Sequence, residues 1–353
     1  MTGVVAEVSR SALQHNIRLL RERVSPARLL AVIKDDAYGH GASFAVEVLR
    51  GEGVDHFGTL ELAPAVALKQ AFPECTLFAW VFDSRDELAP AIAAGVDLGI
   101  TDFATLERAA DAAASAQRPA MIHLKLDTGL HRAGALAGDW PSFVARAAQL
   151  QTQARVQVRG LWTHLAEASD DDDSRSIAEY RDGVAVAAAQ GIEGVTRHVA
   201  ASAASYFRED SRFDMVRIGA FLYGIAPGGG IGATDLGLVP VMTLRAPIIA
   251  TEVRDSRTLA VLGIGGSDGI LSDAAGAVSV TLAGRRYPVV SVDPFSMTVD
   301  VTGGSASPGD LVTLFGRADQ GEPTLQEWAD AMGTIGEEIV TRLSGAIPRR
   351  YVA

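Results

Sequence analysis

Eight short runs of apolar, β-favouring residues alternate with helical segments in the part of this 353-residue chain that ends at residue 219. The runs are Leu29–Ile33, His56–Leu60, Thr76–Val81, Val96–Ile100, Met121–Leu126, Val156–Thr163, Val195–Ala200 and Asp214–Gly219. Short apolar runs separated by segments with a period of 3.6 residues are typical of βα units and a parallel sheet. A doubly wound open sheet would give the same local pattern, but eight units favour a closed (β/α)8 TIM-type barrel.

A helix is expected before the first of these runs. In residues 9–23, the side chains of Leu13, Ile17 and Leu20 fall on one helical face, and Ser9 or Ser11 can cap the start. We therefore expect a helix ahead of all of these strands.

A glycine-rich segment, residues 226–233, marks a boundary in the chain. Closely spaced strand-like runs follow it, at residues 238–252, 258–263, 277–282, 286–292, 297–301 and 311–315, with helices expected at 325–332 and 335–343. The sequence thus predicts an α/β barrel over residues 1–228 and a mostly β C-terminal domain over residues 229–353.

The charge and the cysteine content exclude several classes of partner. The net charge is −12 and the estimated pI is 5.1, which argues against nucleic acid and against an anionic membrane surface. No apolar run approaches the length of a membrane span, and the first residues do not resemble a signal peptide. The single cysteine, Cys75, allows no intramolecular disulfide. We expect a cytoplasmic protein that binds neither nucleic acid nor membrane.

Lysine is rare in this chain, and one lysine ends the first apolar run. Only three of the 31 basic residues are lysines, namely Lys34, Lys69 and Lys125. The carboxyl ends of barrel strands form the active-site face, so Lys34 is expected there. Apolar packing lowers the pKa of a lysine and leaves the free amine that Schiff-base chemistry requires. Taken alone, Lys34 also fits a surface lysine that caps a strand end.

The residues after Lys34 carry a longer signal. The segment Lys34-Asp-Asp-Ala-Tyr-Gly-His-Gly is similar to the cofactor-lysine signature of alanine racemases, in which Ala-Asn usually follows the lysine. Further matches occur in the family's order from about residue 6 to residue 352. The resemblance implies a pyridoxal 5'-phosphate (PLP) cofactor on Lys34, with Tyr38 close to its phosphate.

A second match covers residues 123–134, His-Leu-Lys-Leu-Asp-Thr-Gly-Leu-His-Arg-Ala-Gly. The resemblance implies that Lys125 is carbamylated and that it orients the catalytic Arg132. A carbamate is an anion that can hold a guanidinium with two hydrogen bonds. Lys125 lies inside an expected strand, where a bare ammonium would be costly.

The remaining matches place the other cofactor residues. They lie in residues 160–166, 198–204, 213–224 and 347–352, and they imply His164, His198, Ser202, Arg217, Gly219, Ala220 and Tyr351 as the cofactor shell. Ser202 and the backbone N–H groups of Gly219 and Ala220 would bind the phosphate, and Tyr351 would complete this cup with Tyr38. Arg217 would face the pyridine nitrogen, which an arginine cannot protonate.

The C-terminal part departs from the family at the second proton-transfer group. Racemisation needs a group on each face of the intermediate, and in the family a tyrosine of the partner subunit supplies one of them. None of the six tyrosines of this chain lies between Leu238 and Gly269. Residues 246–264 run from one strand into the next as though that loop were deleted.

Three kinds of function remain open at this point. The chain racemises an amino acid with Asp268, Asp293, Ser267 or water as second group, or it reacts on the Lys34 face alone, or it binds PLP without turnover as a carrier or regulator. The missing loop would widen the entrance for amino acids larger than alanine. The resemblance implies a PLP-dependent isomerase that interconverts L- and D-amino acids, in a homodimer with pockets at the interface.

A barrel enzyme without PLP, such as a metal hydrolase, is a further class to weigh. The run Asp170-Asp171-Asp172-Asp173 is the feature that suggests a metal. Four consecutive carboxylates do not easily converge on one ion. Like charges in a run repel one another and stay hydrated, so we expect a solvated loop there.

Overall fold

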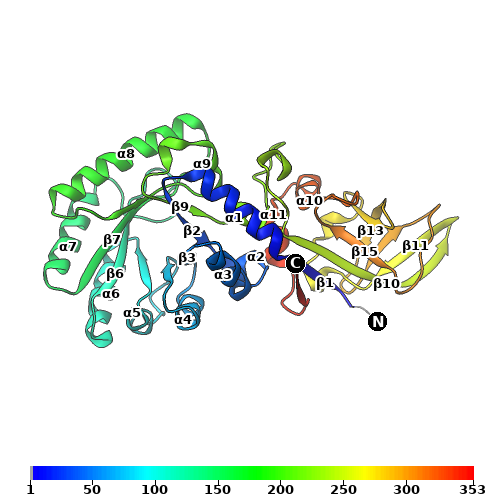
Figure 1. The fold of residues 1–353 in the computed structure, drawn as a ribbon, viewed down its shortest axis with the longest axis horizontal. Coiled ribbons are helices and arrows are strands. Elements are labelled where there is room, and N and C mark those ends of the chain that lie inside the picture. Colours follow the sequence, from blue (N-terminus) through cyan, green and yellow to red (C-terminus); the bar gives the residue numbers. More distant parts are fainter. Residues whose placement is uncertain (1–2) are drawn as a thin grey trace. The chain divides into compact units, whose positions relative to one another are not determined.

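The computed structural model describes residues 3–353 and contains two compact units. One unit, residues 20–34 and 53–219, is built around a closed barrel of eight strands (Figure 1). The strands are β2 (Arg28–Val32), β3 (His56–Thr59), β4 (Thr76–Ala79), β5 (Asp97–Ile100), β6 (Ala120–Lys125), β7 (Val156–Trp162), β8 (Thr196–His198) and β9 (Met215–Ile218). Every neighbouring pair is parallel, and β9 pairs with β2 to close the ring. The predicted barrel is confirmed.

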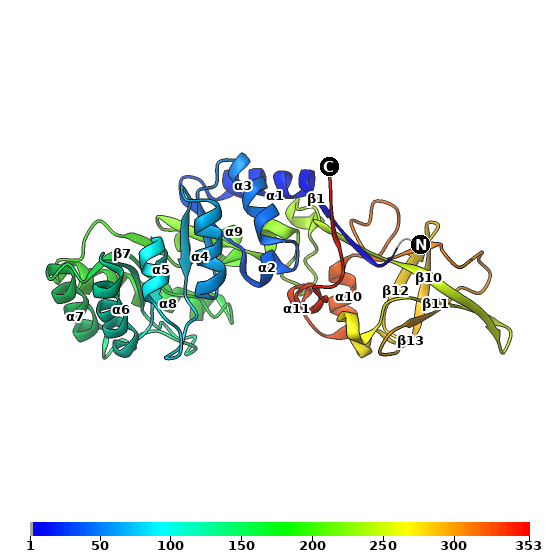
Figure 2. The same ribbon diagram turned by 90° about the horizontal axis from the view of Figure 1, so that it is seen from below.

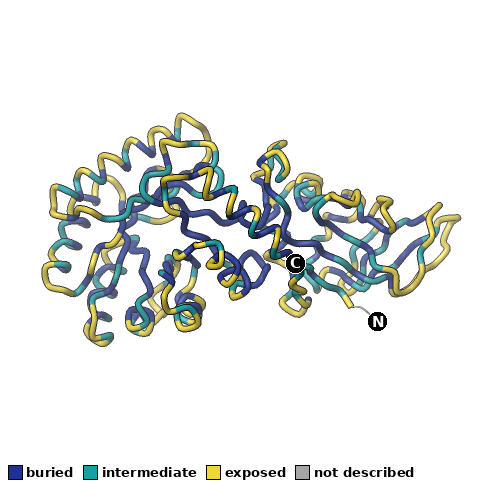
Figure 3. The backbone as a smooth tube through the Cα atoms, in the orientation of Figure 1, coloured by how far each residue is buried: buried dark blue, intermediate teal, exposed yellow. Residues whose placement is uncertain are grey.

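Helices cover the outside of the barrel strands, as two views of the ribbon show (Figures 1 and 2). They are α4 (Leu62–Ala71), α5 (Ala89–Ala94), α6 (Phe103–Ala116), α7 (Trp140–Thr152), α8 (Asp170–Ala189) and α9 (Ser202–Phe207). Most residues of the barrel strands are buried, as expected for a parallel sheet under helices, although Gln157 and Arg159 of β7 are exposed (Figure 3). Tyr180 of α8 is fully buried, and its hydroxyl donates to the carbonyl of Leu161 at 2.6 Å.

The other unit, residues 1–19, 35–52 and 220–353, holds an eight-stranded sheet with the order β11-β14-β13-β12-β15-β10-β1-β16. Its strands are β1 (Val5–Ser9), β10 (Met242–Arg254), β11 (Arg257–Leu262), β12 (Ser279–Leu282), β13 (Arg285–Val292), β14 (Met297–Asp300), β15 (Leu311–Phe315) and β16 (Arg349–Val352). Its helices include α3 (Ala42–Gly51), α10 (Leu325–Met332) and α11 (Gly336–Arg342). The predicted mostly β domain is confirmed.

The N-terminal prediction was incomplete, because a strand precedes the helix. Strand β1 comes directly before α1 (Arg10–Val24) and pairs antiparallel with β10 and parallel with β16. Only the alternation of buried Ala6 and Val8 indicates it in the sequence. The compact units do not divide at one point of the chain, and the limits 1–228 and 229–353 stay a prediction for separate domains.

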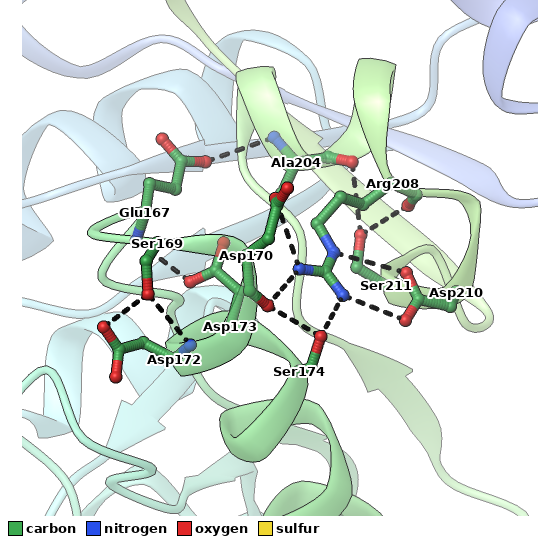
Figure 4. Close-up of polar contacts among 10 residues, drawn as sticks. All are labelled: Glu167, Ser169, Asp170, Asp172, Asp173, Ser174, Ala204, Arg208, Asp210 and Ser211. Atoms are coloured by element: carbon green, nitrogen blue, oxygen red, sulfur yellow. Dashed lines mark hydrogen bonds and ion pairs between the residues drawn. The ribbon is translucent and has the colours of Figure 1, made fainter.

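The prediction of a solvated loop at residues 170–173 was wrong. These aspartates form the first turn of α8, and the N-capping Ser169 accepts a hydrogen bond from the backbone N–H of Asp172 (Figure 4). Acidic side chains are favourable at a helix N-terminus, where the helix dipole is positive. Asp173 is buried and accepts from the backbone N–H of Glu167 at 3.1 Å. Within residues 3–353, no group of three or more His, Cys, Asp or Glu side chains could hold a metal ion.

Strands β10 and β11 form a hairpin with a tight turn. Arg254 pairs with Arg257, so only Asp255 and Ser256 lie between the strands, with φ values of 49° and 63°. Two residues with positive φ form the type I′ turn, whose twist suits a two-residue hairpin. Among the described residues, no helix is both long and apolar enough to cross a membrane.

Candidate active site

Lys34 directly follows strand β2 and begins an unusual turn. In α2 (Lys34–Tyr38), Asp35, Asp36 and Ala37 have φ values of 52°, 53° and 58°, so the turn is left-handed. A left-handed conformation costs roughly 1–2 kcal/mol per non-glycine residue. Such a turn persists only where its surroundings hold it. The backbone N–H of Gly39 donates to the carbonyl of Asp35 at 2.8 Å and closes it.

The buried side chain of His40 holds this turn from within. Its Nδ1 lies 2.9 Å from the carbonyl oxygens of both Ala37 and Tyr38. Burial lowers the pKa of His40 to about 4, so the ring is neutral and Nδ1–H is the donor. The ring also stacks on Tyr223, with centroids 4.7 Å apart. Sequence reasoning missed His40, although it lies inside the quoted signature.

Lys125 ends strand β6 inside the barrel. Its side chain is buried, and its ammonium lies 4.7 Å from the centre of the Trp162 ring. Burial first, and then the positive charges of Arg132 and Arg217, lower the pKa of Lys125 to about 8. Arg132 lies in the loop after β6 and is exposed. The site therefore presents a lysine that gives up its proton more readily than an ordinary one.

Arg217 of strand β9 is buried among acceptors. Its guanidinium donates to the carbonyls of His198, Thr163 and Val199 at 2.9–3.0 Å. It also donates to Nδ1 of His198 at 3.2 Å and to Nδ1 of His164 at 3.1 Å. Burial lowers the pKa of Arg217 to about 10, which leaves it charged at neutral pH. Arg217 is thus a fixed cation that can only donate.

His164 is held as a neutral ring beside this cation. It follows β7, and burial together with the charges of Arg217, Arg132, Lys125 and Lys34 lowers its pKa to about 2. Because Arg217 donates to Nδ1, the ring proton of His164 lies on Nε2. His164 therefore offers one N–H donor and no charge.

Ser202 and Gly219 come together at the ends of two neighbouring strands. The backbone N–H of Gly219, directly after β9, donates to Oγ of Ser202 at 3.0 Å. Ser202 begins helix α9 after β8. The carboxylate of Glu167 accepts from the backbone N–H of Ala204 and ties the loop after β7 to this helix (Figure 4).

The structure places most of the predicted site residues in the barrel unit. They are Lys34, Lys125, Arg132, His164, His198, Ser202, Arg217 and Gly219. Tyr38, Ala220 and Tyr351 belong to the other unit, where the backbone of Ala220 hydrogen-bonds Tyr38 and the ring of Tyr351 stacks on Phe44 at 4.0 Å. Sequence reasoning missed Asp97 and did not assign His123, which hydrogen-bonds His198.

The donors of the barrel unit fit PLP. Lys34 supplies a primary amine for the aldehyde. Ser202 and Gly219 supply a hydroxyl and an N–H, which suit a phosphate. Arg217 supplies a donor that suits a ring nitrogen bearing no proton.

Comparisons with known proteins cover nearly the whole chain. The alanine racemase N-terminal domain model matches residues 8–227, and the C-terminal domain model matches residues 249–351. The alanine racemase of Thermobifida fusca is 37% identical over 98% of this chain and 97% of the relative, and that of Salinispora tropica is 36% identical over 98% and 97%.

Solved structures give the same result. Alanine racemase from D-cycloserine producing Streptomyces lavendulae has a TM-score of 0.95 and 33% identity, covering 100% of this chain and 98% of that one. Alanine racemase from Bartonella henselae with covalently bound pyridoxal phosphate has a TM-score of 0.88 at 23% identity, with 100% of both chains covered, and it has the same fold.

Proposed function

The chain belongs to the alanine racemase family, and from this premise we propose how its own residues carry out the reaction. It is a PLP-dependent isomerase that interconverts L- and D-amino acids. Full-length similarity to enzymes gives no support to the carrier alternative. The position of Lys34 at the carboxyl end of a barrel strand, in one unit with Lys125, His164 and Arg217, is the observation that carries the assignment of roles.

Lys34 is proposed to hold PLP covalently and to move a proton at the substrate Cα on one face. When bound, PLP supplies the electron sink that makes this proton acidic. Arg217 would donate a hydrogen bond to the ring nitrogen of PLP, and a guanidinium cannot protonate that nitrogen. Arg132 binds the substrate carboxylate as a guanidinium clamp. His164 and His198 hydrogen-bond Arg217 and would orient it, and Ser202 with Gly219 would bind the phosphate.

The assignments of Tyr38, Ala220 and Tyr351 to the phosphate rest on the family resemblance. In their own unit, burial and the charges of Glu337 and Asp35 raise the pKa of Tyr38, which keeps its hydroxyl protonated. The side chain of Tyr351 is about half exposed, and its hydroxyl lies beside Gly41. Both tyrosines can therefore donate a hydrogen bond to an anion.

The second proton-transfer group is proposed to differ from the family's tyrosine. The β10–β11 hairpin leaves two residues for its turn, and the chain has no tyrosine from residue 238 to residue 269. Asp268, Asp293, Ser267 and water are the candidates. Asp268 accepts from the backbone N–H of Gly265 at 3.0 Å, and Asp293 from Ser291 at 3.2 Å.

Solvent exchange at Cα tests the reaction and the second group together. With L-alanine in D2O, we expect D-alanine to form with deuterium at Cα, and a panel of larger amino acids shows the substrate range. Asp268→Asn and Asp293→Asn identify which carboxylate serves the second face, and water or Ser267 is indicated if neither slows inversion. Exchange that never leads to inversion would contradict racemisation and favour chemistry on the Lys34 face alone.

Lys125 is expected to be carbamylated. With a pKa of about 8, roughly one amine in ten is unprotonated at pH 7. CO2 adds to this amine, forms a C–N bond and releases a proton, which replaces repulsion between Lys125 and Arg132 by attraction. We expect a carbamate 13C NMR signal with labelled bicarbonate, which grows from pH 7 to pH 9 at constant dissolved CO2.

Lys125→Ala should remove this carbamate signal, and the matched Lys69→Ala should keep it. Lys69 lies on the surface and donates to the carbonyls of Pro73 and Cys75. A signal that survives in Lys125→Ala would refute the assignment.

The chain is proposed to form a homodimer through the β unit, with the pockets at the interface. Several apolar side chains of this unit are exposed, among them Ile249 (55%), Val253 (79%), Val290 (40%) and Phe295 (78%). Clustered exposed apolar side chains mark interaction surfaces. Ile249 and Phe295 both border the segment 263–265. Phe295→Asp should weaken the dimer by roughly ten-fold or more in sedimentation equilibrium.

Val81→Asp is the matched control for the dimer. Val81 is 52% exposed and lies in the barrel unit, so its substitution should leave the sedimentation profile unchanged. A monomeric wild-type protein at micromolar concentration, or equal effects of the two substitutions, would contradict the proposed interface.

A cytoplasmic location is also part of the proposal. Cys75 is the one cysteine of the chain, and it is buried. A single cysteine forms no intramolecular disulfide, which is compatible with a reducing compartment. Cell fractionation with an antibody against the chain tests it.

A further inference from the structure

Four buried side chains are hydrogen-bonded in series across the interior of the barrel. Arg217 of β9 contacts Nδ1 of His198 at 3.2 Å, and Nε2 of His198 lies 2.8 Å from Nδ1 of His123 on β6. Nε2 of His123 lies 3.3 Å from the carboxylate of Asp97 on β5. All four residues are at most 5% exposed. The series connects a buried cation with a buried carboxylate through two imidazoles.

The donors of this series all point in one direction. A guanidinium has no acceptor, so Arg217 donates to Nδ1 of His198. Burial and the neighbouring His123 and Arg217 lower the pKa of His198 well below its usual range, so His198 is neutral and carries its proton on Nε2. That proton is donated to Nδ1 of His123, whose own proton must then lie on Nε2 and point at Asp97.

The interior is shaped to hold these rings. Gly160 of β7 pairs with His123, and a Cβ at residue 160 would overlap the ring at Nδ1 and lie 2.7 Å from Cε1. The ring of Phe78 packs against that of His123, with centroids 4.7 Å apart, and the ring of Trp162 stacks on that of His198, with centroids 5.8 Å apart. Aromatic surroundings exclude water from the middle of the series, where hydrogen bonds are electrostatically stronger.

The carboxylate end of the series is close to solvent and to a cation. Asp97 lies 3.9 Å from Arg159, whose side chain is 48% exposed. A small cavity that is also lined by Arg28 and His56 reaches Asp97 and His123. The carboxylate of Asp97 thus contacts His123 on one side and a guanidinium on the other.

We propose that Asp97 and His123 are positioning residues for the reaction, because their hydrogen-bonded series through His198 makes Asp97 the remote counter-ion of Arg217. The direct hydrogen-bond partners of Arg217 are carbonyl oxygens and imidazole nitrogens, which carry no full negative charge. The polarised series transmits part of the negative charge of Asp97 to Arg217. It also fixes the orientation of the guanidinium. The effect on catalysis rests on the proposed function, in which Arg217 faces the cofactor ring.

The series itself is tested by NMR on the protein without PLP. We expect both His123 and His198 to be Nε2–H tautomers with downfield imidazole protons. Asp97→Asn keeps an acceptor for His123 and removes only the charge, so both imidazole protons should move upfield. Gly160→Ala should disturb the same two signals by displacing the His123 ring. Asp55→Asn, which alters the surface pair of Asp55 with His56 at 2.6 Å, is the matched control and should move neither.

The effect on catalysis is tested in the PLP-loaded enzyme. For Asp97→Asn we expect a shifted absorption band of the lysine-bound cofactor and a kcat roughly ten-fold lower, the lower end of what outer-shell partners contribute at metal sites. KM should stay within about two-fold, because Asp97 does not contact substrate. Asp55→Asn should match the wild type in band and kcat.

Two outcomes would overturn the proposal. One is an Nδ1–H tautomer for His123 or His198, or a His198 signal that does not shift in Asp97→Asn. The other is an Asp97→Asn enzyme whose band and kcat equal those of the wild type although the NMR signals move. Failure of PLP to bind at all would instead refute the proposed function, and the NMR result for the series would stand.

Discussion

Replacing Lys34 by alanine is expected to abolish the absorption band of the lysine-bound cofactor and to lower racemisation by roughly a thousand-fold or more. The substitution removes both the amine that bonds to PLP and the group that moves the proton on one face. Positioned general acid–base groups alone contribute about 10²–10⁴-fold. The side chain lies after β2, before a left-handed turn held by His40, so its loss leaves the core unaltered.

The matched control for this prediction is Lys69→Ala. Lys69 lies on α4 and donates to two backbone carbonyls at the surface, so band and rate should equal those of the wild type. Adding a primary amine to Lys34→Ala should restore part of the exchange at Cα if the missing group is the amine. An unchanged band in Lys34→Ala would show that PLP is held elsewhere.

Replacing Arg217 by methionine is expected to lower the free energy of unfolding by about 3–5 kcal/mol, the usual effect of removing one partner from a buried charged network. The substitution leaves three backbone carbonyls and two imidazole nitrogens without their donor. It also leaves the series from His198 to Asp97 without the cation at its end. Urea unfolding of the protein without PLP measures the loss.

Arg197→Met on the neighbouring strand is the matched control for Arg217→Met. Arg197 pairs with Asp214 at 2.9 Å, with side chains 43% and 35% exposed. Partly exposed pairs of this kind contribute only about 0–1 kcal/mol. Equal losses for the two arginine substitutions would contradict the buried network described for Arg217.

The barrel could be predicted because each of its strands is a local pattern. The run predicted at residues 96–100 is buried on every residue, and no long-range information is needed to find it. The same holds for the ends of strands, where Lys34 and Lys125 were predicted. The strand β1 was missed because its five residues look like the lead-in to a helix, and only the distant β10 and β16 make it a strand.

Other features depend on tertiary context that the sequence does not display locally. The left-handed turn after Lys34 contradicts residue preferences, and contacts such as those of His40 stabilise it. The run of four aspartates was predicted to be a solvated loop, because the sequence alone does not show that Ser169, directly before it, caps a helix. His123 and Asp97 were not assigned, because their partners lie on other strands: His198 is 75 residues from His123, and Asp97 is 26.

The most direct test of Lys34 as the residue that holds PLP is to reduce the PLP-loaded protein with borohydride and to map the modified peptide by mass spectrometry. The chain has only three lysines, Lys34, Lys69 and Lys125, so each site is resolved without ambiguity. We expect a pyridoxyl adduct on Lys34, with Lys69 and Lys125 unmodified and racemisation lost. An adduct on Lys125 or Lys69 with Lys34 unmodified, or no adduct on any lysine of an active enzyme, would contradict it.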